Sequence, residues 1–510
     1  MRAVWLSLAL ALLGAAAVAP TPASAAGIAT FAVVVGVNRS VDSSAALLRY
    51  ADDDAARFRD LFHAVGTRTH VLTRMDDNTR RLYPAAAQET PPRLEALKAA
   101  VAEVAAEVAQ ARKRGERTVF YFVYAGHGMA QGQGGYITLE DARLSGPDLI
   151  GQIIDPIAAD QSHLIVDACN SYFLVLDRGP GGTRRALRGF TALGAIAQRR
   201  DVGLLLSTSS ARESHEWAAF QAGIFSHEVR SGLYGAADAD GDGVISYLEI
   251  AAFIDRANES VPNERFRPEV FSRPPDGVSG LLDLRPALAR QIEVNGPYRG
   301  HYYVEDTAGV RLADFHNAGT VRLVRPSPDK LYLRRKGEDR EYVLLPSVAA
   351  LRTADLPLQE SHAAVRGAAN DAFNTLFALP FGTDSVQTYG TREEARVRVE
   401  ELENRAARQT RIRSVAGVGL AVTGVAAVTG GVISYLGTRS LRQAVNADTP
   451  QNEVLDTNQK ITSRNRTTGL LLGAGAAALG GSALLLLWPE SPINLTLSCD
   501  GLAAGWRGSF

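Results

Sequence analysis

The chain has 510 residues, with 54 basic and 55 acidic side chains, a formal net charge of -1 and 46% hydrophobic residues. A charge so close to zero argues against a general nucleic-acid-binding protein, and the length provides for two or three domains with full-sized cores. The two cysteines, Cys169 and Cys499, lie in regions separated by membrane-type sequence, and we interpret both as free thiols.

The first 25 residues have the pattern of an export signal. Arg2 precedes an apolar stretch over residues 3–18, and residues 23–25, Ala-Ser-Ala, form a small-residue cleavage site. We therefore expect the mature chain to begin near Ala26 and to work outside the cytoplasm.

Residues 26–285 alternate apolar strands with amphipathic helices. We expect strands at 31–37, 70–73, 118–124, 163–168 and 203–207, and helices at 45–65 and 92–114. This alternation predicts an α/β domain in which helices cover both faces of a mainly parallel sheet. A turn-rich segment at 267–277 closes the domain.

Two of the expected strands lead directly into reactive residues. His127 and Gly128 follow the strand at 118–124, and Cys169 follows the strand at 163–168. Both lie at carboxyl ends of strands, where open parallel sheets bind their ligands. A thiolate that attacks a peptide carbonyl needs an imidazole to accept the thiol proton and to protonate the leaving amine.

We therefore assign Cys169 as the nucleophile and His127 as the acid/base, and we expect the backbone amides of Gly128 and Cys169 to bind the developing oxyanion. Taken singly, a cysteine is often only buried and a histidine at a strand end is often only hydrogen-bonded. Their joint position at two strand ends favours catalysis.

The two motifs together resemble the caspase-like family of cysteine peptidases, and most closely its metacaspase and bacterial caspase-like branch. The resemblance rests on residues 124–128, Tyr-Ala-Gly-His-Gly, and on residues 167–171, Asp-Ala-Cys-Asn-Ser, and it covers residues 28–285. Asn170 stands where metacaspases often have His, and no glycine follows the second motif. The resemblance implies a caspase-like three-layer sandwich and a cysteine endopeptidase.

The resemblance also implies cleavage after Arg or Lys, because family members with an Asp two residues before the nucleophile have that preference. Asp167 occupies this position, and Asp54 lies where metacaspases have a second acidic pocket residue. Two carboxylates can accept a guanidinium through paired, charge-assisted hydrogen bonds. The alternative is that Asp167 caps the following helix and that Asp54 is a solvated residue at a helix start.

A basic, glycine-rich segment follows Cys169. Its arginines are Arg178, Arg184, Arg185, Arg188, Arg199 and Arg200. Because the equivalent linker is often cut in related enzymes, we hypothesise self-cleavage after one of them; the alternative is an ordinary flexible loop.

A second motif, residues 238–249, matches the 12-residue loop of an EF-hand, with glycine at loop position 6. The expected Ca²⁺ ligands are Asp238, Asp240, Asp242, the Val244 carbonyl, Ser246 and Glu249. The sequence has no paired second hand, and glycines interrupt the entering segment. An Asp/Gly turn between two helices therefore remains the alternative.

The remainder of the chain has a different organisation. Residues 288–349 change to a period of two, which predicts a small antiparallel β domain. Residues 350–413 follow as a helical stalk, and a capping box at 391–394 opens its charged helix.

Two uncharged apolar stretches, 414–437 and 467–488, are each long enough to cross a hydrocarbon core of about 30 Å. They predict a transmembrane hairpin around a loop at 438–466, followed by a tail at 489–510. Gly469 and Gly473 form the expected packing face of the second span. The alternative is a pair of buried helices in a soluble domain.

Together these features predict a cysteine endopeptidase that is exported and anchored on the periplasmic side of a bacterial membrane. Its expected partners are a protein or peptide substrate and the membrane, with no nucleic acid. Ca²⁺ is the expected ion at the EF-hand-like loop, and the chemistry itself requires no cofactor. The alternative is a binding or signalling module that keeps the caspase-like fold without turnover.

Overall fold

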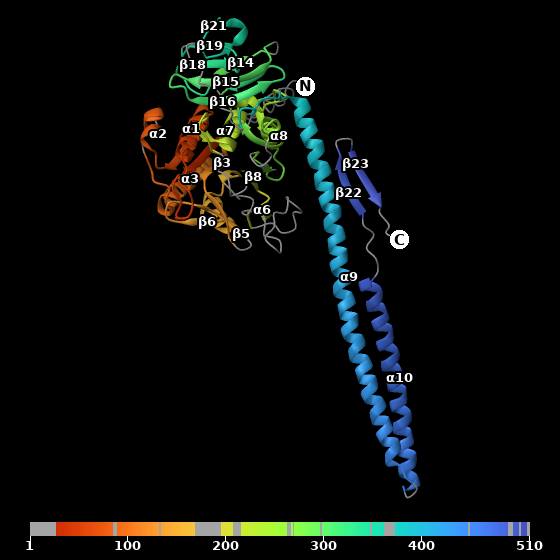
Figure 1. The fold of residues 1–510 in the computed structure, drawn as a ribbon. Helices are drawn as coiled ribbons and strands as arrows, with labels where there is room; N and C mark the ends of the chain where they lie inside the picture. The colour runs from red at the N-terminus through yellow and green to blue at the C-terminus, as the bar shows by residue number, and fades with distance from the viewer. Residues whose placement is uncertain are drawn as a thin grey trace, which may run out of the picture. The chain divides into compact units, whose positions relative to one another are not determined.

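The computed structural model describes residues 27–84, 89–131, 134–168, 195–207, 216–262, 267–268, 270–295, 298–346, 349–361, 373–446, 449–487, 493–498 and 501–506. Cys169, Cys499 and the expected export signal lie outside these ranges, as do the linker arginines up to Arg188. The chain divides into two compact units with the boundary after Gly390 (Figure 1).

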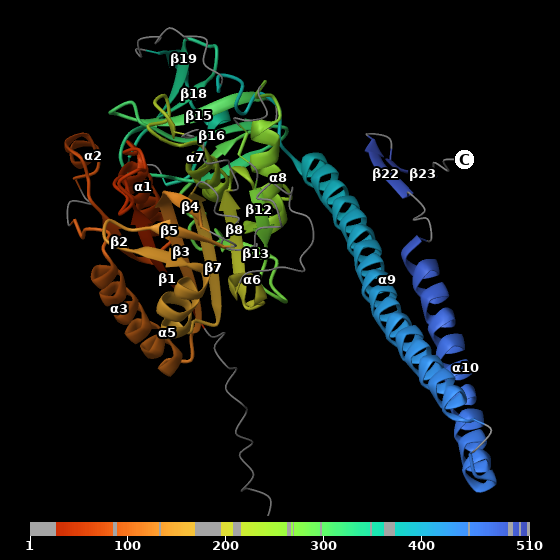
Figure 2. The ribbon, with the colours of Figure 1, turned by 60° about the horizontal axis from the view of Figure 1, so that its bottom comes forward.

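The first unit is built on a six-stranded sheet (Figure 2). Its strands are β1 (Ile28–Gly36), β2 (Arg68–Thr73), β3 (Arg117–Gly126), β7 (Gln161–Ala168), β8 (Val202–Ser207) and β12 (Val270–Arg273), in the spatial order β12-β8-β7-β3-β1-β2. Only β12 pairs antiparallel within this sheet. The prediction of a mainly parallel sheet is confirmed, and the nearly unbroken buried runs of β1 and β3 fit a sheet covered on both faces.

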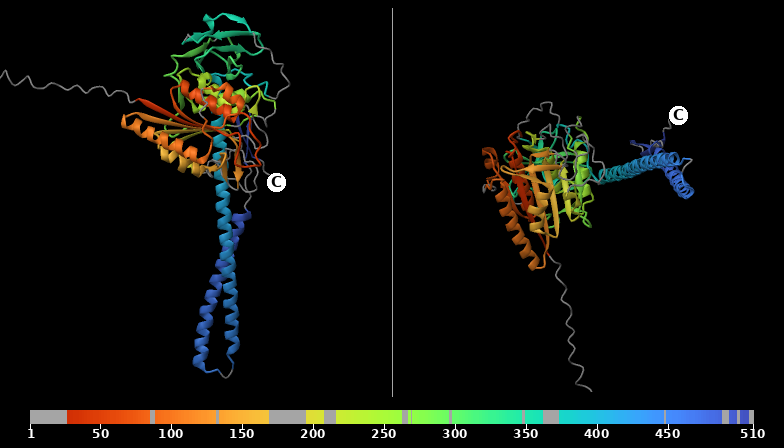
Figure 3. Two further views of the ribbon diagram at one scale, coloured as in Figure 1. Left: turned by 90° about the vertical axis from the view of Figure 1, so that its left-hand side faces the viewer. Right: turned by 90° about the horizontal axis from the view of Figure 1, so that it is seen from below.

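Helices lie on opposite sides of this sheet (Figure 3). One layer contains α1 (Ala51–Ala64), α7 (Ile224–Ser231) and α8 (Tyr247–Asn258), and α3 (Leu94–Lys113) lies on the other side. Phe58, Phe225 and Phe253 of the first layer share one hydrophobic core with Val34 of β1. Because the side chains of a strand alternate between the two faces, β1 contributes to both layers.

Shorter elements connect these layers. They are α2 (Asp77–Leu82), β4 (Gly128–Gln131), β5 (Gly134–Thr138), β6 (Arg143–Ser145), α4 (Gly146–Leu149), η2 (Ile150–Ile154), α5 (Asp155–Ile157), α6 (Ala195–Gln198), β9 (Glu216–Trp217), β10 (Ala222–Gly223), η5 (Gly232–Ala236), β11 (Val244–Ser246) and β13 (Gly280–Asp283). Of these, β4 and the β9–β10 hairpin contribute residues to the candidate site.

The β domain consists of two small sheets, ordered β17-β14-β20 and β16-β15-β18-β19-β21. Its strands are β14 (Gln291–Val294), β15 (Gly300–Asp306), β16 (Arg311–Asn317), β17 (Val321–Val324), β18 (Leu331–Arg335), β19 (Arg340–Leu344), β20 (Leu351–Arg352) and β21 (Leu358–Glu360), with η7 at Thr353–Asp355. The pairing is antiparallel except between β14 and β20. The domain therefore extends past 349, and the prediction of a helical stalk from 350 onward is wrong for residues 351–360, which complete both sheets.

The described C-terminal helices are longer than the sequence pattern predicts. α9 runs from Thr383 to Ala444 and α10 from Gln451 to Leu487, and a short hairpin of β22 (Ile493–Ser498) and β23 (Gly501–Trp506) follows. The expected capping box at 391–394 is wrong, because α9 already begins at Thr383 and continues through it. Most of the expected loop at 438–466 is helical too, because α9 continues to Ala444 and α10 begins at Gln451.

Both helices are long and apolar enough to cross a membrane, with windows of mean hydropathy 1.8 in 408–444 and 2.1 in 451–487. Gly424 of α9 and Gly475 of α10 meet where the helices pack, since a Cβ on Gly475 would lie 3.0 Å from the Gly424 carbonyl oxygen. The expected packing face is wrong. Around Gly469 and Gly473, no heavy atom of the described residues beyond their own helix lies within 4 Å of a Cβ position.

Candidate active site

The two residues of the predicted dyad, His127 and Cys169, follow the ends of two neighbouring strands in the chain. β3 and β7 are neighbouring parallel strands, and their last aligned residues are Gly126 and Ala168. His127 follows Gly126 directly, and Cys169 follows Ala168 in the chain but lies outside the described residues. Neighbouring strands are about 4.8 Å apart, so the last residues of β3 and β7 lie at one edge of the sheet.

The imidazole of His127 is oriented by a backbone carbonyl. Its Nε2 lies 2.6 Å from the carbonyl oxygen of Ala46. A carbonyl oxygen only accepts hydrogen bonds, so Nε2 carries the proton and donates it, and Nδ1 keeps its lone pair as a base. Burial lowers the pKa of His127, while the hydrogen bond to Ala46 and the charge of Asp42 act in the opposite direction. The ring is therefore neutral at pH values near 7.

The loop that carries Ala46 is fixed by a buried carboxylate. Asp42 accepts hydrogen bonds from the Arg143 guanidinium and, at 3.0 Å, from the Tyr136 hydroxyl. The backbone amide of Val41 also donates to the carbonyl of Leu139 at 2.8 Å. These contacts attach the loop to β5 and β6, the strands that follow the His127 turn.

Tyr124 supports the His127 turn from inside the sheet. Its buried hydroxyl lies 2.9 Å from the His127 carbonyl and 2.7 Å from the Thr138 carbonyl. A Cβ on Gly126 would lie 2.5 Å from that hydroxyl, which explains a glycine at this position. Gly128, the expected oxyanion donor, is buried at the start of β4 and pairs with Ile137.

Asp167 lies two residues before the nucleophile position and beside Ala125 of β3. Its Oδ2 accepts hydrogen bonds from the Ser226 backbone amide at 3.0 Å and from the Ser226 hydroxyl at 2.6 Å. Asp167 therefore caps the first turn of α7. Burial raises the pKa of Asp167 to about 7, and the negative charge of Asp54 contributes to this increase. The residue nevertheless keeps part of its surface exposed.

Asp54 is only 2% exposed, in contrast to the solvated residue of the alternative interpretation. Its Oδ1 accepts a hydrogen bond from Arg230 at 2.6 Å, and its Oδ2 accepts one from the Gly223 amide at 2.8 Å. Burial raises its pKa, and the charge of Arg230 opposes that change. Asp54 and Arg230 thus form a buried ion pair.

Both acidic residues adjoin Gly223. A Cβ at this position would lie 2.7 Å from Oδ2 of Asp167 and 3.2 Å from Oδ2 of Asp54. The structure therefore brings the two predicted pocket residues to one place, with the backbone of β10 directly against them. Asp54, Asp167 and Arg230 together have one net negative charge when both carboxylates are ionised.

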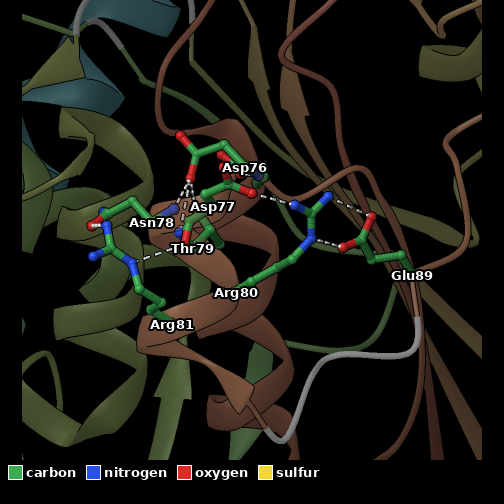
Figure 4. Close-up of polar contacts among 8 residues, drawn as sticks. Asp76, Asp77, Asn78, Thr79, Arg80, Arg81 and Glu89 are labelled. Carbon is green, nitrogen blue, oxygen red and sulfur yellow. Dashed lines mark hydrogen bonds and ion pairs between the residues drawn. The ribbon is translucent and has the colours of Figure 1, made fainter.

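The two acidic residues beside Asp54 have other roles. Asp52 accepts hydrogen bonds from the Asn38 amide group and from the Asp76 backbone amide, and Asp53 accepts one from the Thr79 hydroxyl. Asp76 in turn caps α2 by accepting from the amides of residues 78 and 79 (Figure 4). These contacts fix the first turn of α1, so that only Asp54 of the acidic run lies against Asp167.

The expected calcium loop has three carboxylates close together. Oxygens of Asp238, Asp240 and Asp242 lie within 4.8 Å of one another. The Gly243 amide donates to Asp238 at 3.1 Å, and the Val244 amide donates to Asp242 at 2.7 Å. This geometry closes the loop around its acidic side chains.

The end of the loop at 238–249 is tied to the rest of the α/β domain. Glu249 is buried and accepts hydrogen bonds from the amides of Ala239 and Ser246, and Ser246 completes a capping box at the start of α8. β11 includes Val244 and Ser246, and it pairs with β13 of the same domain. The loop is thus held by a strand of the same domain.

Several residues of the site were not identified from sequence. Tyr124 belongs to the histidine motif, but its role depends on the folded turn. Ser226 and Arg230 lie on α7, and Asp42 lies in a loop without a recognisable motif. Glu216 of β9 accepts hydrogen bonds from the amides of residues 49 and 50, which delays the start of α1 to Ala51, after the expected residue 45.

The chain is similar to known proteins over part of its length. Residues 29–267 match a family model described as "Caspase domain". A solved structure titled "structure of pro-sf-caspase-1" matches with 13% sequence identity and a TM-score of 0.31, over 50% of this chain and 94% of that chain. No curated protein matches the chain. The matched residues include Asp54, His127, Asp167, Cys169 and the loop at 238–249, and the match ends before the β domain.

Proposed function

Because residues 29–267 are a domain of the caspase family, we propose that this protein is a cysteine endopeptidase with Cys169 as its nucleophile and His127 as its acid/base. The observation that supports this most is the alignment of Gly126 with Ala168 on neighbouring parallel strands. Gly126 and Ala168 lie at the same edge of the sheet, and in the chain each directly precedes one of the two reactive residues.

In the proposed reaction, Nδ1 of His127 accepts the thiol proton of Cys169, and the sulfur bonds to the substrate carbonyl carbon. The tetrahedral oxyanion is held by the backbone amides of Gly128 and Cys169. Cleavage of the carbon–nitrogen bond then releases the amine, which takes the proton from His127. Water deprotonated by Nδ1 hydrolyses the acyl-enzyme and restores the thiol.

For specificity we propose a basic residue, Arg or Lys, on the amino side of the cleaved bond. Asp167 supports this proposal because it is partly exposed and lies two residues before the nucleophile. Asp54 has its charge balanced by Arg230, so its part is to share the site at Gly223 and to contribute to the raised pKa of Asp167. The net charge of this group favours a substrate cation.

A direct test uses fluorogenic peptides that end in Arg, Lys or Asp. The purified chain is expected to cleave the Arg and Lys peptides, Cys169→Ala to cleave none, and Asp167→Asn to lose most activity on the basic peptides. Cleavage that persists in Cys169→Ala would refute the nucleophile assignment. A wild-type chain that alkylates at Cys169 but cleaves no peptide would instead favour the non-catalytic binding module.

For the loop at 238–249 we propose a Ca²⁺ site with Asp238, Asp240, Asp242, the Val244 carbonyl, Ser246 and Glu249 as ligands. Their oxygen atoms are the type that Ca²⁺ prefers. Calorimetric titration with CaCl₂ is expected to show saturable binding that Asp240→Ala abolishes, while Asp276→Ala, an exposed control, leaves it unchanged. Equal heats for wild type and Asp240→Ala would refute the site.

For localisation we propose that α9 and α10 form a membrane hairpin and that the peptidase domain lies outside the cytoplasm. The lengths and hydropathies of the two helices support this arrangement. The full chain is expected to resist carbonate extraction from membranes, and protease added to spheroplasts is expected to digest the peptidase domain. Release by carbonate would refute the anchor, and protection from the protease would refute the orientation.

A further inference from the structure

The helix α7 provides two of the contacts that define the acidic site, by which we mean Asp54 and Asp167 beside Gly223. Ser226 donates two hydrogen bonds to Asp167, and Arg230 forms the buried ion pair with Asp54. These two residues are four apart and therefore lie on one face of the helix. Any displacement of α7 would move both contacts together.

The neighbouring face of α7 is held by a buried carboxylate of the β domain. Asp314 of β16 is fully buried and accepts hydrogen bonds from Nε2 of His227 at 2.8 Å, from Nε2 of His301 at 2.8 Å and from Arg311. Its backbone amide donates to the Ser231 hydroxyl at 3.0 Å. His227 and Ser231 are also four residues apart, and Figures 1 and 2 both place β16 beside α7.

The same strand also holds the hairpin that leads to Gly223. The ring of Phe220 stacks on His227, with ring centres 3.9 Å apart, and the guanidinium of Arg311 lies 5.3 Å from the Phe220 ring centre. Phe220 is three residues before Gly223, the residue that adjoins both carboxylates. β16 therefore fixes two sides of the acidic site, the helix and the hairpin.

The chemistry of these contacts makes the arrangement specific. Burial lowers the pKa of His227 to about 4, so its ring is neutral at neutral pH and donates one proton from Nε2 to Asp314. Arg311 supplies the charge that balances the carboxylate, and charge-assisted hydrogen bonds of this kind are directional. A buried carboxylate with three side-chain donors allows few alternative positions for α7.

We infer that Asp314 is a positioning residue for substrate selection, which holds α7 and thereby the Asp167 and Asp54 contacts in place. The β domain thus helps to hold the residues of the acidic site in position, in addition to any other role that it has. The substrate aspect of this inference rests on the proposed function, whereas the support of α7 does not.

The experiment compares Asp314→Asn and the milder Ser231→Ala with wild type in the full chain. Glu341→Gln is the matched control, because Glu341 is an equally buried carboxylate of the β domain that binds Arg334 and Ser361 away from α7. Hydrogen exchange of the backbone amides of α7 and of β3 is measured first. KM and kcat for the Arg peptide are measured second.

Both Asp314→Asn and Ser231→Ala are expected to accelerate exchange in α7, by about tenfold or more for Asp314→Asn, with β3 unchanged. KM for the Arg peptide is expected to rise most in the variant whose α7 exchanges fastest, while kcat changes little. Glu341→Gln is expected to resemble wild type in both measurements. Exchange in α7 that matches the Glu341→Gln control in both variants overturns the inference. A wild-type chain without peptidase activity would refute only the proposed function. The exchange measurement would still decide whether Asp314 holds α7 in place.

Discussion

Asp167 and Ser226 are joined by two hydrogen bonds across 59 residues of chain, at 3.0 Å from the amide and 2.6 Å from the hydroxyl. Both bonds favour the ionised carboxylate, yet burial still raises the pKa of Asp167 to about 7. The charge state of the proposed recognition residue therefore changes within the neutral pH range.

The first prediction concerns activity against pH. Binding of a substrate cation requires ionised Asp167, so kcat/KM for an Arg peptide is expected to rise as pH increases through about 7. Ser226→Ala removes one bond to the ionised form and is expected to move that rise to higher pH. Asp167→Asn is expected to abolish it. A rise at the same pH in wild type and Ser226→Ala would show that Asp167 is not the titrating group.

The same shift has a consequence for stability. Between about pH 4 and 7 the folded chain holds a proton on Asp167 that the unfolded chain has released. The free energy of unfolding therefore falls as the pH rises through this range. Asp167→Asn removes this contribution and is expected to flatten that decline. Denaturant unfolding of both proteins at several pH values measures it. Parallel curves for the two proteins would contradict the raised pKa.

A third prediction concerns Gly223, whose backbone dihedrals, φ -62° and ψ 138°, are open to any residue. Gly223→Ala is expected to reduce stability and activity for steric reasons only, because its Cβ would lie 2.7 Å from Oδ2 of Asp167. Overpacking of this kind costs about 1–3 kcal/mol, and we expect kcat/KM for Arg peptides to fall by about tenfold or more. Gly151→Ala has no described neighbour within 4 Å and is the control with unchanged kinetics.

The parts of this site that were predictable from sequence depend on local patterns, and the parts that were not depend on contacts between residues far apart in the chain. The strand before His127 and the strand that contains Asp167 have continuous apolar runs, so their carboxyl ends were predicted from local pattern. The dyad itself stays a prediction, because Cys169 lies outside the described residues. Asp54 was placed correctly at the acidic site only through the family resemblance, and its burial was not foreseen. Its partner Arg230 lies 176 residues further along the chain, and no local pattern encodes that contact.

The errors at the C-terminal side have a similar origin. Residues 351–360 lack strong alternation, and they become strands because β14 and β19 offer free edges for pairing. The glycines of α10 were assigned by their spacing alone, whereas packing depends on which face meets α9. Gly473 and Gly475 are two residues apart and therefore point to different sides of the helix.

The last prediction compares substitutions at Gly475 and Gly473, which point to different sides of α10, so that the second substitution is the control for the first. Gly475→Leu places a side chain where a Cβ would already lie 2.9 Å from the Val428 amide nitrogen, so the helices must separate. Gly473→Leu adds the same group to a face with no described neighbour within 4 Å. Thermal unfolding of the α9–α10 hairpin, followed by circular dichroism in detergent on the full chain, is expected to occur at a lower temperature only for Gly475→Leu. Because close backbone approach at small residues is a main source of packing between apolar helices, an equal effect of both substitutions would mean that α10 uses a different face against α9.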